Sequence, residues 1–156
     1  HAEYLWKALC QNHIQCVVTD HAPHTKEDKS KPFGKAPSGM PGVQTVLSLM
    51  LNQVNQGHCS LDDVINWTSR NTAKCFNIEN KGQIKEGFDA DLVLINLEGK
   101  KRISNKDQVS KCGWSAFDGV EVQGYPISTY VNGQEVYREG DFFEDIKGKE
   151  VNIKRS

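Results

Sequence analysis

The stretch Cys16-Val17-Val18-Thr19-Asp20-His21-Ala22-Pro23-His24 decides the fold that this sequence predicts. A short apolar run stops at a carboxylate, which is followed by two imidazoles and a proline. Proline lacks an amide hydrogen and disfavours helix for the residue before it, so a regular element must end there. We therefore expect a strand over residues 14–19 that delivers Asp20 into the loop at its C-terminal end. Parallel α/β enzymes, (β/α)8 barrels in particular, keep their chemistry at that end.

The residues before this run predict a helix. Apolar side chains recur at helical intervals over residues 3–9, and residues 11–13 interrupt the pattern. A helix, a short loop and a β-branched strand form the αβ half of a βαβ repeat. The apolar run does not alternate, as expected for a parallel sheet buried on both faces. One strand cannot make a sheet, so its neighbours must come from elsewhere.

Further along, helical patterns give way to β patterns near residue 78. Apolar spacing predicts a helix between Val43 and Gly57, a capping box at Ser60 opens another that runs through Trp67, and a short one follows over 70–76. Strands are predicted over 82–84 and 91–95, and a hairpin over 127–138 turns at Asn132-Gly133. Residues 111–124 are expected to be rich in loops, and the charged tail from residue 141 to be partly ordered at best.

Composition excludes several classes of partner and site. The 19 basic and 20 acidic residues nearly balance and form no basic stripe, so nothing supports a nucleic-acid partner. No apolar run approaches the roughly 20 residues of a membrane-spanning helix. The five cysteines include no C-x-x-C pair, which argues against a disulfide framework or a zinc knuckle and favours a reducing, cytoplasmic setting.

The residues alone leave open which chemistry the stretch from Cys16 to His24 performs. Asp20 could ligate a metal, act as a general base, or form an Asx-turn in its loop. His21 and His24 are three apart in a loop, a poor spacing for paired zinc ligands, so we expect His21 to be structural or to orient the carboxylate. The glycine- and proline-rich loop over 36–42 is either an ordinary surface loop or one that faces a substrate. Serine-hydrolase and P-loop motifs are absent from the sequence.

Five stretches together resemble the dihydroorotase family of the cyclic amidohydrolase superfamily. Near residue 72 that family usually has Asn-Pro-Ala, and Thr72 here replaces the proline. The resemblance covers nearly the whole chain and rests on Thr19-Asp20-His21-Ala22-Pro23-His24-Thr25, Ala36-Pro37-Ser38-Gly39-Met40-Pro41-Gly42-Val43-Gln44-Thr45, Lys81-Gly82-Gln83-Ile84, Gly87-Phe88-Asp89-Ala90-Asp91-Leu92-Val93 and Lys111-Cys112-Gly113-Trp114-Ser115-Ala116-Phe117-Asp118-Gly119.

The resemblance implies an α/β fold, with residues 1–78 as the C-terminal segment of a (β/α)8 TIM-type barrel and 79–156 as the C-terminal part of a small β-sandwich domain. It implies a zinc pair and the interconversion of N-carbamoyl-L-aspartate and dihydroorotate in pyrimidine synthesis. Asp20 would be the catalytic carboxylate and a ligand of one metal, passing a proton to the ring nitrogen during ring opening. His24, Ser38 and Gly39 would bind the substrate. A homodimer or association with aspartate transcarbamoylase is also implied.

This sequence lacks the H-x-H pair, the bridging lysine or acid and the two later histidines that complete the family's metal site. It begins with His1 rather than Met, and we expect it to be the C-terminal portion of a larger enzyme, inactive on its own. Two alternatives stay open. One is an amidohydrolase similar to hydantoinases or allantoinases, and the other is an inactive dihydroorotase-like subunit that serves as a scaffold for aspartate transcarbamoylase.

Overall fold

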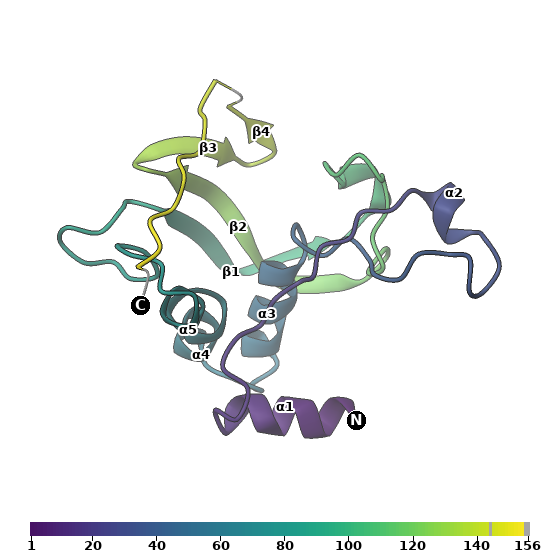
Figure 1. Cartoon of the computed structure of the whole chain (residues 1–156), viewed down its shortest axis with the longest axis horizontal. Helices are drawn as coiled ribbons and strands as arrows, with labels where there is room; N and C mark the ends of the chain where they lie inside the picture. The colour runs from purple at the N-terminus through teal and green to yellow at the C-terminus, as the bar shows by residue number, and fades with distance from the viewer. Residues whose placement is uncertain (144, 155–156) are drawn as a thin grey trace. The chain divides into compact units, whose positions relative to one another are not determined.

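The computed structural model describes residues 1–143 and 145–154, which form an α/β arrangement of short helices and one four-stranded sheet (Figure 1). The sheet has the strand order β1-β2-β3-β4. No helix among these residues is long and apolar enough to span a bilayer. The elements are α1 (Ala2–Cys10), α2 (Lys26–Lys29), α3 (Val46–Asn55), α4 (Leu61–Ile65), a π-helical turn (Asn66–Arg70), α5 (Asn71–Cys75), β1 (Leu92–Arg102), a 3-10 turn (Asn105–Asp107), β2 (Glu121–Val131), β3 (Gln134–Arg138) and β4 (Asp141–Phe142).

The chain divides into two compact units, each built from separate stretches of sequence. The first contains residues 1–17 and 56–96 and the chain from residue 126 onward, and the second contains residues 18–55 and 97–125. Both units therefore draw on residues before and after position 78. The division into a barrel segment over 1–78 and a β-sandwich segment over 79–156 stays a prediction.

Aromatic packing between α1 and the π-helical turn forms the core of the first unit. The rings of Trp6 and Trp67 meet edge to face, with centroids 5.8 Å apart. Trp67 and Val64 are almost fully buried. The capping box that begins α4 is confirmed, because Ser60 Oγ accepts from Asp63 N at 3.1 Å while Ser60 N donates to Asp63 Oδ2 at 2.8 Å.

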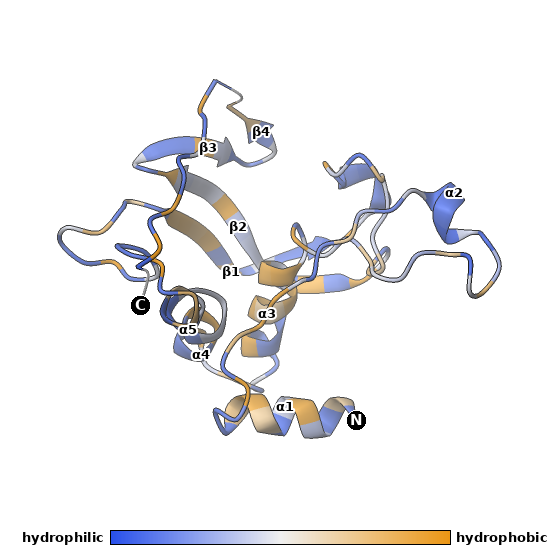
Figure 2. Ribbon diagram, in the orientation of Figure 1, coloured by the Kyte–Doolittle hydropathy of each residue, from blue (hydrophilic) through white to orange (hydrophobic). Residues whose placement is uncertain are grey.

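Helix α3 forms the core of the second unit, and Figure 2 shows that it is largely hydrophobic. Its Leu51 is fully buried. A Cβ built on Gly124 in β2 would lie 2.6 Å from Leu51 Cβ, so helix and strand can approach this closely only because residue 124 is glycine. The Asn55 side-chain amide donates to Leu97 O at 2.9 Å and to Gln123 O at 3.0 Å, which joins α3 to the two strands.

The predicted hairpin is confirmed, but one neighbouring prediction, the strand over 82–84, is wrong. Strands β2 and β3 are antiparallel, and Asn132 at their turn has φ +50°. Residues 111–120 contain no helix or strand, in agreement with the loop-rich stretch predicted over 111–124, and strand β2 begins at Glu121. Residues 82–84 form no strand. The tail is partly ordered, as predicted: β4 covers Asp141–Phe142, and Ile153 forms a β-bridge with Ile78. Residues 144, 155 and 156 of that tail lie outside the described part.

The predicted strand over residues 14–19 is also wrong. This segment is extended, but it pairs with no strand of residues 1–143 and 145–154. Val17 N instead donates to Trp67 O at 3.0 Å, in the π-helical turn. Val18 is 67% exposed, although the apolar pattern predicts a strand in a sheet that is buried on both faces. A parallel strand is defined by the ladder bonds to its neighbours. The four strands in the described residues form one sheet, and residues 14–19 are not part of it.

A charged network joins the loop before β1 to the hairpin turn. Lys81 Nζ forms ion pairs with Asp91 and, at 3.1 Å, with Asp89. Burial raises the pKa of Asp91, but hydrogen bonds from Asn132 N (2.8 Å) and Lys81 outweigh burial and hold that pKa below its ordinary value. The hydrogen bond to Asp91 raises the pKa of Lys81. Both groups therefore stay charged over a wide pH range.

These shifts predict the pH range in which the network stabilises the fold. The Asp91 contribution is complete above its unfolded pKa of about 3.9 and disappears as the pH falls through the lower folded value. The Lys81 contribution is complete below about pH 10.4 and is lost as the pH rises through the higher folded value. Asp91→Asn should lower the free energy of unfolding by about 1 kcal/mol between about pH 5 and 10, measured by urea denaturation. An equal loss at about pH 2 would contradict this assignment. The effects of Asp91→Asn and Lys81→Met on the free energy of unfolding should be non-additive, because the two residues form an ion pair.

Candidate functional site

The extended segment ends at Asp20 in an unusual backbone conformation. Asp20 has φ +43°, in the left-handed region that most residues with a side chain avoid and that Asp and Asn tolerate best. Its side chain is exposed. The chain therefore turns at Asp20 and leaves the carboxylate accessible, as an acid that meets a small molecule requires.

The residues after Asp20 lie directly against the glycine- and proline-rich loop. Ala22 N donates to Met40 O at 3.0 Å. A Cβ built on Gly39, which has φ +87°, would lie only 2.6 Å from Ala22 Cβ. The two backbones can approach this closely because residue 39 has no side chain. The structure thus brings Gly39 beside the segment that carries Asp20 and His24.

His21 joins the C-terminal end of the same loop to the segment that carries Asp20. Its Nδ1 accepts from Gly42 N at 3.1 Å and from Val43 N at 3.3 Å. Gly42 O accepts the first helical hydrogen bond, from Val46 N at 3.1 Å, so His21 satisfies amides at the N-terminal end of the α3 region. An imidazole nitrogen that accepts two amides is not available as a metal ligand. The structural role predicted for His21 is confirmed.

Lys29 holds the middle of the loop. Thr25 caps the short helix α2 by accepting from Asp28 N at 3.1 Å, and Lys29 is the last residue of that helix. Its ammonium group donates to Pro37 O at 2.7 Å and to Gly39 O at 2.9 Å. These two carbonyls flank Ser38, so one cation fixes the backbone on both sides of a predicted substrate-binding residue.

Trp114 holds the other end of the central stretch. Its indole Nε1 donates to His24 O at 2.7 Å, across a large separation in sequence. His24 is half-buried, whereas Ser38 and Gly39 are exposed. The backbone of His24 is therefore fixed from the second half of the chain, within the same compact unit.

The residues of this site do not hold a metal ion by themselves. Within residues 1–143 and 145–154, no three His, Cys, Asp or Glu side chains gather in a way that could coordinate a cation. Structural zinc takes four ligands and catalytic zinc about three from protein, and Asp20 offers one carboxylate. A metal centre at Asp20 would need ligands that no cluster among the described residues supplies.

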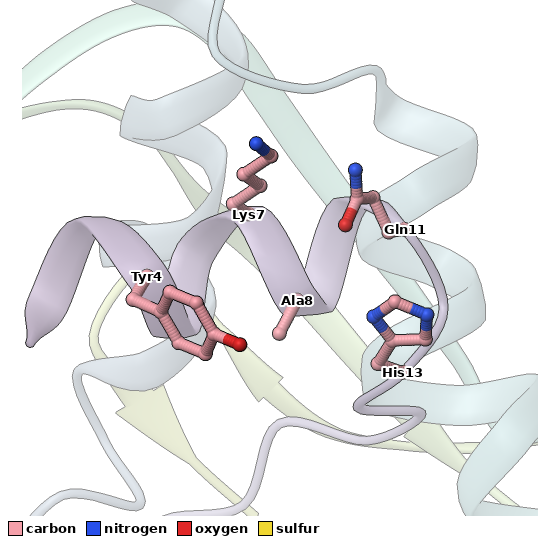
Figure 3. A pocket seen from close by; sticks show the side chains of 5 residues that line it. All are labelled: Tyr4, Lys7, Ala8, Gln11 and His13. Atoms are coloured by element: carbon pink, nitrogen blue, oxygen red, sulfur yellow. The ribbon is translucent and has the colours of Figure 1, made fainter.

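A hollow elsewhere contains none of the predicted site residues. It lies beside α1 in the first unit, measures about 230 Å³ and is lined by Tyr4, Lys7, Ala8, Gln11 and His13 (Figure 3). His13 therefore lines a different surface feature from the segment that contains Asp20.

Sequence reasoning missed two residues that shape the site. Lys29 is one of three lysines within residues 25–31, and only the T-x-x-D pattern of Thr25 and Asp28 could have indicated the helix that positions it. The hydrogen bond from Trp114 to His24 O depends on chain folding that no local pattern encodes.

Comparison with known proteins identifies the family. Residues 1–136 match the model of the amidohydrolase family. The chain belongs to the amidohydrolase family. Among curated members, a dihydroorotase from Halobacterium salinarum is 40% identical over 149 residues, covering 96% of this chain and 35% of the relative. A dihydroorotase from Methanosphaera stadtmanae is 37% identical over 133 residues, covering 85% and 31%. The resemblance to dihydroorotases is therefore confirmed.

A solved amidohydrolase structure supports the fold. The D-hydantoinase (dihydropyrimidinase) from Thermus sp. superposes with a TM-score of 0.85 at 32% identity, covering 90% of this chain and 32% of that one. This chain therefore spans about a third of the length of the amidohydrolases that it matches.

Lys29→Met should loosen the loop over residues 37–41. The change keeps the aliphatic stem but removes two charge-assisted hydrogen bonds, each worth roughly 1.5–3 kcal/mol. We expect amide hydrogen exchange in that loop to become at least about tenfold faster. Lys31→Met is the matched control, because Lys31 pairs with Asp28 at 2.6 Å and should leave the loop's exchange unchanged. Equal effects of the two variants would refute the role of Lys29.

Gly39→Ala should cost more stability than Gly34→Ala in the same part of the chain. The two glycines have φ +87° and +84°, but a Cβ on Gly34 meets no atom within 4 Å. Gly34→Ala therefore carries only the left-handed backbone cost of roughly 1–2 kcal/mol. Gly39→Ala adds the clash with Ala22, about 1–3 kcal/mol more. Urea denaturation of both variants measures the difference, and equal midpoints would show that the close contact relaxes freely.

Proposed function

We propose that the full-length protein containing this chain is a zinc-dependent dihydroorotase that interconverts N-carbamoyl-L-aspartate and (S)-dihydroorotate in pyrimidine biosynthesis. The observation that carries the proposal is the 40% identity to a dihydroorotase across 96% of this chain. That span includes Asp20 and the loop that the structure brings against its segment. The proposed architecture is a (β/α)8 barrel with a small β-sandwich domain, of which this chain supplies the C-terminal parts.

Asp20 is the proposed catalytic carboxylate. In ring opening, water adds to the amide carbon, the carbon–nitrogen bond breaks, and the ring nitrogen needs the proton that water releases. A carboxylate can take that proton and deliver it to the nitrogen, and the reverse order closes the ring. The exposed position of Asp20 at the end of the extended segment supports this role, because the acid must reach both atoms.

His24, Ser38 and Gly39 are the proposed substrate-binding residues. Dihydroorotate carries a carboxylate and ring amides, so an imidazole, a hydroxyl and main-chain groups are suitable partners. Support comes from the way the chain fixes them. Trp114 binds the backbone of His24, and Lys29 binds carbonyls on both sides of Ser38. Pre-organised groups lose little entropy when a ligand binds.

The proposed zinc pair lies only partly in this chain. When bound, zinc would make water acidic near neutral pH and polarise the amide carbonyl. Asp20 would be one ligand, and the described residues offer no cluster that completes the site. A cytoplasmic location and a homodimer or an association with aspartate transcarbamoylase are further proposals, supported only by the family resemblance.

A hydantoinase or dihydropyrimidinase activity is the second candidate. It is favoured by the superposition on the Thermus D-hydantoinase with a TM-score of 0.85. Turnover of dihydroorotate, dihydrouracil and allantoin by the full-length protein separates the candidates. Preference for dihydroorotate supports the first proposal, and preference for dihydrouracil supports the second. No turnover of any of these substrates by zinc-loaded protein would favour the inactive scaffold.

Asp20→Asn tests the catalytic role without disturbing the backbone. Asn tolerates the left-handed conformation of residue 20 as well as Asp does, whereas Ala would add strain. We expect kcat/KM for dihydroorotate to fall by about 10²–10⁴-fold in the full-length protein, with an unchanged circular dichroism spectrum. Asp62→Asn is the control, because it removes an exposed carboxylate that pairs with Arg70 at 2.9 Å. Activity retained by Asp20→Asn would overturn the assignment.

A further inference from the structure

Two cysteines far apart in sequence meet in the first unit. Cys16 Sγ lies 3.7 Å from Cys75 Sγ, as a thiol–thiol hydrogen bond, and both thiols are free. Cys75 Sγ also donates to Gln15 Oε1 at 3.5 Å. Cys75 is exposed and Cys16 is half-buried. The pair is therefore two neighbouring free thiols, one of which belongs to an exposed residue.

The backbone around the pair is fixed on both sides. Asn71 Nδ2 donates to Gln15 O at 2.9 Å, and Val17 N donates to Trp67 O at 3.0 Å, so the hydrogen bonds bracket Cys16. Asn71 and Cys75 are four residues apart in α5 and share one face of the helix. The contact that anchors Gln15 thus also directs Cys75 towards Cys16.

We propose that Cys16 and Cys75 form a thiol-oxidation site that closes reversibly to an intramolecular disulfide when exposed to a low-molecular-weight disulfide such as oxidised glutathione. A disulfide needs its sulfurs about 2.05 Å apart, so the two sulfurs must approach by less than 2 Å. Bonds of this kind in reducing compartments are transient, which fits a reversible site better than a permanent cross-link.

The reaction proceeds by two thiol–disulfide exchanges. The exposed Cys75 thiolate attacks a sulfur of oxidised glutathione, forms a mixed disulfide and releases one glutathione thiolate. The Cys16 thiolate then attacks Cys75 Sγ, forms the protein disulfide and releases the second. Cys16 and Cys75 lose two electrons and two protons in total, and two molecules of reduced glutathione result.

The hydrogen bond from Cys16 raises the pKa of Cys75, so the thiol form predominates at neutral pH. The thiolate is the attacking species, and the exchange is therefore best performed at about pH 8.5. The closed bond would link the extended segment before Asp20 to α5, across a sequence separation of 59 residues. Such a cross-link restricts the unfolded chain, so the oxidised protein should unfold at a higher urea concentration.

The test incubates the full-length protein with oxidised glutathione, alkylates the remaining thiols and maps every cysteine by peptide mass spectrometry. We expect a linked peptide pair containing Cys16 and Cys75, lighter by two hydrogens than the separate peptides, and its loss on reduction with dithiothreitol. Cys75→Ser changes only an exposed side chain and should abolish the linked pair, as should Cys16→Ser. Cys10→Ser and Cys59→Ser are matched controls and should leave it unchanged.

Two results would overturn the proposal. One is that Cys16 and Cys75 both remain alkylatable after oxidation of the wild-type protein. The other is that Cys16 or Cys75 forms its disulfide with another cysteine in the wild type. Because the readout is a covalent bond at named residues, it is independent of any enzymatic activity.

Discussion

The close contact between Ala22 and the loop at Gly39 and Met40 is the constraint on which the candidate site depends. One main-chain hydrogen bond of 3.0 Å and a glycine without a side chain bring two loops together. Neither loop contains a regular ladder to hold it. Together with the hydrogen bonds that His21 Nδ1 accepts from Gly42 N and Val43 N, this contact holds the segment of Asp20 and His24 beside the loop of Ser38 and Gly39. The candidate site therefore depends on both loops and on the contact between them.

The backbone of such loops needs polar partners, because buried amides and carbonyls are costly when unpaired. Here side chains supply them. His21 accepts two amides at the start of the α3 region, Lys29 donates to two loop carbonyls, and Trp114 donates to His24 O. All of these contacts lie within one compact unit. Rigid placement of loop residues by side-chain hydrogen bonds is the arrangement that a binding site on loops requires.

Within the described residues, the extended segment before Asp20 pairs with no strand, and Asp20 belongs to no cluster of metal ligands. As backbone, residues 14–19 are extended and held by the π-helical turn through Val17, with no strand beside them in the described residues. As chemistry, Asp20 is a single carboxylate with no cluster of further ligands among those residues. This chain matches about a third of its relatives' length.

The sequence alone determined the features that depend only on interactions between neighbouring residues. The capping box at Ser60, the turn at Asn132 and the helical stripe of α3 depend on neighbouring residues and were predictable from them. The motif around Asp20 likewise identified the family. Only tertiary structure decided what depends on distant partners: the lack of strand pairing at 14–19 within the described part of the chain, the hydrogen bonds from Lys29 to the loop, and the contact between Cys16 and Cys75. Hydrogen bonds between residues far apart in sequence leave no periodic pattern, so the sequence could not reveal them.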